Sequence, residues 1–182
     1  MNNILLGPVT LDIYVDNNLI LPGGGCLNMA YHWQQLGVPF TLLTRIGQDH
    51  PTVFLEFCQR QQIAYLPDSI VGQGASAAID IVIMPDGQPH MDNFVEGVWA
   101  DFRVSAVEQS LITQADHVHT VLVEGMIREL ERMEEVGVLV KPLVTAAARN
   151  SLQSNINNAS PSFRASLNQY SPRKSNQISI PM

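Results

Sequence analysis

The chain is poor in cysteine and in charge, and it has no long apolar run. Its two cysteines, Cys26 and Cys58, do not form a Cys-x-x-Cys pair, which favours a reduced, cytoplasmic protein over a disulfide-bonded one. No apolar stretch reaches the roughly 18 residues of a membrane span, and residues 1–8 lack the basic start of a signal peptide. We therefore expect no membrane contact. The net charge of −7 argues against nucleic acid as a partner.

The common nucleotide-binding signatures are also missing. The sequence contains no G-x-x-x-x-G-K-[ST], and the glycines at 23–25 do not have the spacing of G-x-G-x-x-G. These absences argue against a P-loop protein and against a dinucleotide-binding fold of the usual kind.

Acidic residues are absent from the last quarter of the chain. Residues 1–135 hold all 17 acidic residues and five of the ten basic ones, whereas residues 136–182 carry a charge of +5. From Asn150 onward the chain is mostly Ser, Asn, Gln and Pro, which cannot bury enough apolar surface to offset the entropy of ordering. We expect one globular part at 1–148 and a disordered, basic tail at 149–182.

Apolar periodicity predicts an α/β fold. Alternation at Ala77–Met84, the turn Pro85–Gln88 and the return through Val95 predict a hairpin. Strands alternating with helices indicate a mainly parallel sheet flanked by helices, with the hairpin as a small accessory sheet. The other predicted strands are 4–6, 11–15, 40–46, 117–123 and the start of one at 138–140. The predicted helices are 26–36, one from Pro51, one that contains Val104, Val107 and Leu111, and one with an apolar stripe of Met126, Ile127, Leu130 and Met133.

A glycine turn precedes the helix that is predicted at 26–36. Gly23 and Gly24 lack a Cβ, so a ligand can approach their backbone N–H groups, and the helix start adds partial positive charge. A phosphate or polarised hydroxyls would fit there. A tight turn with no ligand explains the glycines equally well.

Two polar residues bear on that choice. Asn28 falls in the first turn of the helix, where its amide can both donate and accept, as a sugar requires. The alternative for Asn28 is a capping role. Asp12 follows the first strand and could accept from two neighbouring hydroxyls, or it could be a solvated strand-end carboxylate.

The order of these residues resembles that of PfkB-type (ribokinase-like) carbohydrate kinases. That family has an Asp after its first strand, then Gly-Gly-x-x-x-Asn-x-Ala, Leu-Gly and Gly-x-Asp. The chain is most similar to fructoselysine 6-kinase-like members over roughly residues 4–140. The matching residues are Asp12, Gly23, Gly24, Asn28, Ala30, Leu36, Gly37, Gly47 and Asp49, followed by the stretches Glu96–Phe102 and Asp116–His119.

The resemblance implies a sugar site lined by Asp12, Gly23, Gly24 and Asn28. It implies a lid formed by the hairpin at about 77–99, which could also join two subunits in a homodimer. The substrate would be a sugar or sugar–amine adduct, phosphorylated with ATP and Mg²⁺ by the full-length enzyme. Gly47 and Asp49 are interpreted as shaping their loop.

The catalytic half of that family is absent from this sequence. The Asp-Thr-x-Gly-Ala-Gly-Asp motif, which would supply the catalytic base and part of the ATP site, does not occur. We therefore expect no catalytic residue and no ATP binding in this chain, and a truncated kinase. The alternatives are a non-catalytic sugar-binding or regulatory module and a truncated product without function. His117 and His119 lack a third ligand at standard spacing, so we expect no metal site.

Overall fold

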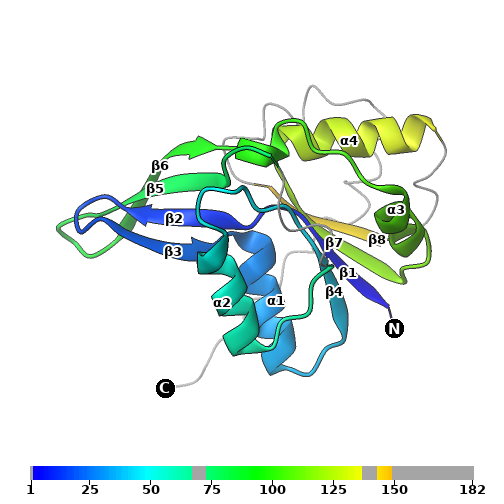
Figure 1. Ribbon diagram of the computed structural model, residues 1–182, viewed down its shortest axis with the longest axis horizontal. Helices are drawn as coiled ribbons and strands as arrows, with labels where there is room; N and C mark the ends of the chain where they lie inside the picture. The colour runs from blue at the N-terminus through cyan, green and yellow to red at the C-terminus, as the bar shows by residue number, and fades with distance from the viewer. Residues whose placement is uncertain (1, 67–72, 137–142, 149–182) are drawn as a thin grey trace, which may run out of the picture.

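The computed structural model describes residues 2–66, 73–136 and 143–148, the last of these as backbone only (Figure 1). The described helices and strands are β1 (Asn3–Leu6), β2 (Thr10–Tyr14), β3 (Leu19–Gly23), α1 (Gly25–Gln35), β4 (Phe40–Leu43), α2 (Pro51–Gln61), β5 (Ala77–Ile83), β6 (Pro89–Val95), the 3-10 turn η2 (Gly97–Trp99), α3 (Ala106–Thr113), β7 (His117–Leu122), α4 (Glu124–Glu135) and β8 (Leu143–Ala148).

The main sheet is parallel and lies between two pairs of helices. Its strand order is β4-β1-β7-β8, and every neighbouring pair runs parallel. Ile4 and Leu6 of β1 belong to the core cluster that contains the buried residues of α3 and α4, whereas Leu5 belongs to the cluster of α1 and α2. This alternation places one helix pair on each face. The predicted α/β fold is confirmed.

A second sheet, β3-β2-β5-β6, extends from one end of the main sheet (Figure 1). In it β2 pairs antiparallel with β3 and parallel with β5, and β5 and β6 form the predicted hairpin. Ile13, Ile20 and Ala78 pack toward the core of α1 and α2. Asp12 is in register with Leu21 and Ile79, so these three residues share the opposite face. The sequence analysis missed β3.

Two other predictions differ from the structure. The strand predicted at 40–46 ends at Leu43. The helix predicted with Val104, Val107 and Leu111 is α3, which begins only after Val104; in it Val107 is 58% exposed, and the buried residues are Glu108 and Ile112. Glu108 forms an ion pair with Arg45, which allows a charged residue to face the interior.

Several expectations fall outside the described residues. They concern the strand start at 138–140 and the tail at 149–182. Within the described ranges, no helix has the length and apolar character that crossing a membrane requires.

Candidate functional site

Asp12 lies within β2, half-buried, with its carboxylate against the backbone of Gly23. Thr10 Oγ1 donates to Asp12 Oδ1 over 2.7 Å. A Cβ added to Gly23 would approach all three carboxylate atoms of Asp12 to within 3.0 Å, closer than real Cβ atoms come. The structure thus brings two of the predicted site residues together. The position of Asp12 inside a strand does not fit a solvated strand-end carboxylate.

Gly24 forms the corner between β3 and α1. It is the N-cap of α1 with φ 96°, and an added Cβ would lie 2.9 Å from both Pro8 O and Thr10 N. Gly24 gives α1 no side-chain cap, and the first turn of the helix holds no acidic residue. Only glycine fits this close approach in a left-handed conformation without strain. Within the described residues, the first backbone N–H groups of α1 thus have no side-chain acceptor at this corner.

Asn28 lies one turn into α1 with its side chain exposed. Its backbone N–H donates to Gly24 O over 3.0 Å, as an ordinary helical bond. Since α1 starts at Gly25 without a side-chain cap, the capping alternative for Asn28 is wrong. Within the described part of the chain its amide makes no hydrogen bond to Asp12. A ligand contact of Asn28 therefore stays a prediction.

Asp49 holds together the loop that follows β4. Its Oδ1 accepts from Ser76 N over 3.0 Å and from Ser76 Oγ over 2.7 Å, and Gly47 N donates to Ser76 Oγ over 3.0 Å. Burial favours the neutral carboxyl, but the hydrogen bonds from Ser76 outweigh it and lower the pKa of Asp49. This geometry agrees with the interpretation of Gly47 and Asp49 as loop-shaping residues.

Glu96 is a structural contact that the sequence analysis did not identify. Its carboxylate follows β6 and accepts from the backbone N of Glu124 over 2.5 Å and of Gly125 over 3.0 Å, at the start of α4. Glu124 itself pairs with Arg128 over 2.8 Å. The signal available in the sequence was the Glu-Gly pair at 96–97, but no local pattern points to a partner 28 residues away.

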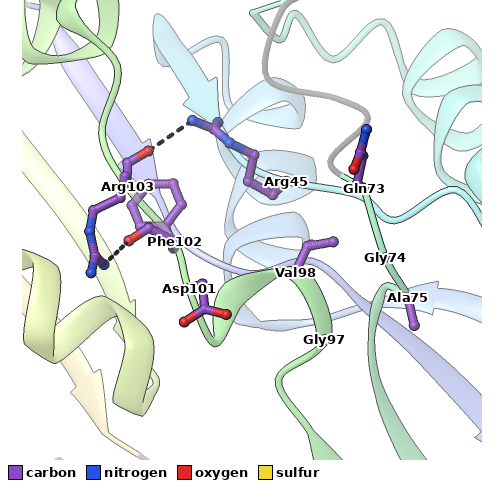
Figure 2. Close-up of a pocket in the computed structure, with 9 residues that line it drawn as sticks. All are labelled: Arg45, Gln73, Gly74, Ala75, Gly97, Val98, Asp101, Phe102 and Arg103. Atoms are coloured by element: carbon purple, nitrogen blue, oxygen red, sulfur yellow. Dashed lines mark hydrogen bonds between the residues drawn. The ribbon is translucent and has the colours of Figure 1, made fainter.

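A separate pocket of about 440 Å³ lies between the loop after β4 and the segments around β5 and β6 (Figure 2). Neither Asp12 nor Asn28 lines it, nor do the corner glycines. Its lining residues are Arg45, Gln73, Gly74, Ala75, Gly97, Val98, Asp101, Phe102 and Arg103. Four of these, Gly97, Val98, Asp101 and Phe102, belong to the Glu96–Phe102 stretch, which the sequence analysis noted only as a family resemblance.

Candidate metal ligands are sparse among the described residues. No group of three or more His, Cys, Asp or Glu side chains that could hold a metal occurs among them. His119 is buried, with its ring centroid 6.3 Å from that of Trp33.

Comparison with solved structures assigns the fold to the ribokinase-like class. Arabidopsis thaliana ribokinase, solved with ribose and ATP, aligns over 81% of this chain with a TM-score of 0.58 and 17% identity. The nucleoside kinase of Methanocaldococcus jannaschii, a ribokinase-family member, aligns over 92% with a TM-score of 0.62 and 15% identity. Halothermothrix orenii fructokinase aligns over 80% with a TM-score of 0.57 and 15% identity. At these identities the likeness establishes the fold.

The chain spans about half the length of these structures. It covers 52% of the Arabidopsis ribokinase chain, 57% of the nucleoside kinase and 56% of the fructokinase. No protein-family model matches the sequence, and no curated protein matches it significantly.

Proposed function

We propose that this chain is the sugar-binding half of a PfkB-type carbohydrate kinase, most similar to the fructoselysine 6-kinase group. The full-length enzyme would transfer the γ-phosphate of ATP to a hydroxyl of a sugar or sugar–amine adduct. The ribokinase-like fold and the sugar kinases among its structural neighbours support the proposal. This chain contributes substrate binding, and the catalytic base and the ATP site lie outside its sequence.

The position of Asp12 is the observation that carries the proposal. Its carboxylate is oriented by Thr10 and seated on Gly23, beside the uncapped start of α1. A fixed carboxylate accepts from two vicinal hydroxyls, and backbone N–H groups at a glycine corner donate to a sugar oxygen. Asn28, exposed on the first turn of α1, would add an amide that donates and accepts.

The test is titration calorimetry of the 182-residue chain with D-fructose, D-ribose and fructosyl-lysine. We expect one of these ligands to bind, and Asp12→Ala to weaken its binding at least about tenfold, because a charge-assisted hydrogen bond contributes about 1.5–3 kcal/mol. Asp12→Asn preserves the shape over Gly23 and should lose nearly as much. Thermal unfolding should show that both variants stay folded.

Two outcomes would contradict the proposal in different ways. A folded Asp12→Ala variant with unchanged sugar affinity removes Asp12 from the site. A folded wild-type chain that binds none of the three ligands favours a product without function. Sugar binding without ATP turnover is expected both of a separated kinase half and of a regulatory module, whereas turnover by this chain alone would overturn the assignment of catalysis to the missing half.

We further propose a homodimer through the lid hairpin at about 77–99, which contributes β5 and β6 to the second sheet. Ile83 at the end of β5 and Met91 of β6 have 46% and 54% of their surface exposed. Exposed apolar side chains on a sheet are typical of subunit contacts.

A further inference from the structure

Two carboxylates tie the base of the β5–β6 hairpin to the rest of the molecule. Ser76, just before β5, is bound by Asp49, whose Oδ1 accepts from Ser76 N over 3.0 Å and from Ser76 Oγ over 2.7 Å. Glu96, just after β6, accepts from the backbone N of Glu124 over 2.5 Å and of Gly125 over 3.0 Å. One strand of the hairpin is thus fixed to the loop after β4, and the other to the start of α4 (Figure 1).

Glu96 supplies a cap that α4 itself lacks. The N-cap residue of α4 is Val123, whose side chain cannot accept a hydrogen bond. In contrast, α3 has its own capping box from Ser105 and Glu108. A carboxylate at a helix start accepts from free N–H groups and interacts favourably with the helix dipole. The place of Glu96 is therefore favoured by these contacts and not only by the path of the chain.

The two ties differ in their contact with solvent. Ser76 is 1% exposed, and a Cβ added to Gly47 would approach its backbone N to within 3.0 Å, so this side is closely packed. Glu96 is half-buried, and its bond to Glu124 N lies at the surface. Water replaces a surface hydrogen bond at small cost, whereas a buried group left without a partner is costly. The Asp49 tie is thus the fixed one, and the Glu96 tie is the one that can open.

The backbone can rotate next to Glu96 but is held firmly beyond it. Gly97 has φ 54°, a left-handed conformation that glycine adopts without strain. Trp99 is fully buried, and a Cβ added to Gly125 would overlap its carbonyl oxygen. A rotation of the second sheet would therefore occur about Ser76 and Gly97, directly beside the Glu96 contact.

The angle of the second sheet bears on the proposed sugar site, because that site has groups on both sides of the junction. Asp12 lies on β2 in register with Ile79 of β5, three residues beyond Ser76. Asn28 lies on α1, which packs against the main sheet. A change in the angle of the second sheet therefore moves Asp12 relative to Asn28.

We propose that Glu96 is a positioning residue for the sugar site. By capping α4 it holds the second sheet at the angle at which Asp12 and Asn28 reach the same sugar. Without this tie the sheet samples several angles, and the apparent sugar affinity falls with the fraction of molecules that are competent to bind. The effect on sugar binding rests on the proposed function, whereas the tie between the second sheet and α4 does not.

The test compares Glu96→Ala with Asp92→Ala. Asp92 is an exposed carboxylate of the same strand end that accepts from the adjacent Asn93 N, so its loss removes an equal charge and leaves α4 untouched. Residual dipolar couplings of backbone amides in the full chain measure the orientation of the second sheet relative to the main sheet. In Glu96→Ala the couplings of β5 and β6 should fall relative to those of β1 and β7, whereas Asp92→Ala should match the wild type.

Sugar affinity is the second readout. With D-fructose, D-ribose and fructosyl-lysine as probes, Glu96→Ala should weaken the binding seen in the wild type about fivefold. Glu96→Gln keeps one acceptor oxygen and should lose less, and it takes the place of Glu96→Ala in both readouts if that variant does not fold. Asp92→Ala should bind as the wild type does.

The two readouts separate the possible failures. Unchanged couplings in a folded Glu96→Ala chain would overturn the proposal, and so would changed couplings with unchanged sugar affinity. A wild-type chain that binds none of the probes overturns the proposed function and with it the role of Glu96 at the sugar site. The couplings then still decide whether Glu96 orients the second sheet.

Discussion

The main sheet and the second sheet differ in how deeply their strands are buried. All four residues of β1 are buried, whereas every residue of β6 except the half-buried Phe94 is exposed. Packing between helix pairs accounts for the residues of β1. It does not account for a hydrogen-bonded carboxylate at Asp12 or for exposed apolar side chains such as Met91. Residues that packing leaves unexplained point to binding, so the second sheet is where we expect function.

The largest effect should come from the junction of the main sheet and α4. Gly125→Ala would place a Cβ against Trp99 O and Ala100 O, which are backbone atoms that cannot move aside cheaply. We expect a loss of at least about 3 kcal/mol of unfolding free energy, or failure to fold. Urea denaturation followed by circular dichroism measures this.

Gly37→Ala is the matched control for that substitution. Gly37 follows α1 with φ 67°, and nothing lies within 4 Å of an added Cβ. Only the conformational cost of about 1 kcal/mol remains. Equal losses at Gly37 and Gly125 would show that the contact between Gly125 and η2 does not constrain the junction.

The second effect concerns the ion pair between Arg45 and Glu108. Glu108 is 1% exposed and also completes the capping box of α3 with Ser105. Glu108→Gln removes the carboxylate that neutralises Arg45, and we expect a loss of roughly 3 kcal/mol of unfolding free energy at pH 7. Glu56→Gln, at an exposed position of α2, should change stability by less than about 0.5 kcal/mol in the same urea titration.

The stability that is lost in Glu108→Gln should also depend on pH in the acid range. Burial alone would raise the pKa of Glu108, but hydrogen bonds from Arg45 and Ser105 lower it below the usual 4.5. A lowered pKa contributes stability above pH 4.5 that disappears as the pH falls through the folded-state value. The difference between wild type and Glu108→Gln should therefore shrink below pH 4.5. A constant difference down to pH 2 would contradict this assignment.

The smallest effect on stability should come from the second sheet. Met91→Gln exchanges a side chain that is 54% exposed, so we expect a change within about 0.5 kcal/mol. If the proposed dimer forms through this sheet, the same change should weaken it, as measured by sedimentation equilibrium. If the dimer affinity is unchanged, the subunit contact lies elsewhere. If the unfolding free energy falls by much more, the second sheet contributes to stability as the main sheet does.

Sequence patterns predicted the elements that packing controls. The apolar stripe of Met126, Ile127, Leu130 and Met133 predicted α4, and all four side chains are buried. The strand β3 escaped prediction because Pro22 and Gly23 near its end are typical of a turn, and the strand depends on pairing with β2.

The candidate site was predicted only in part, because a local motif contains some of its contacts and not others. The seat of Asp12 on Gly23 joins residues that a local motif already placed in order. The contacts of Glu96 with α4 and of Glu108 with Arg45 join residues 28 and 63 positions apart, and no local pattern contains that information.

Because of the carboxylate of Glu96, amide exchange at the start of α4 reports on the position of the second sheet. The backbone amides of Glu124 and Gly125 are held by a side chain that follows β6, and not by the helix itself. When the end of β6 lifts away, these two amides meet water. Their exchange with deuterium therefore measures how often the two sheets part, and a ligand that bridges the sheets should slow it.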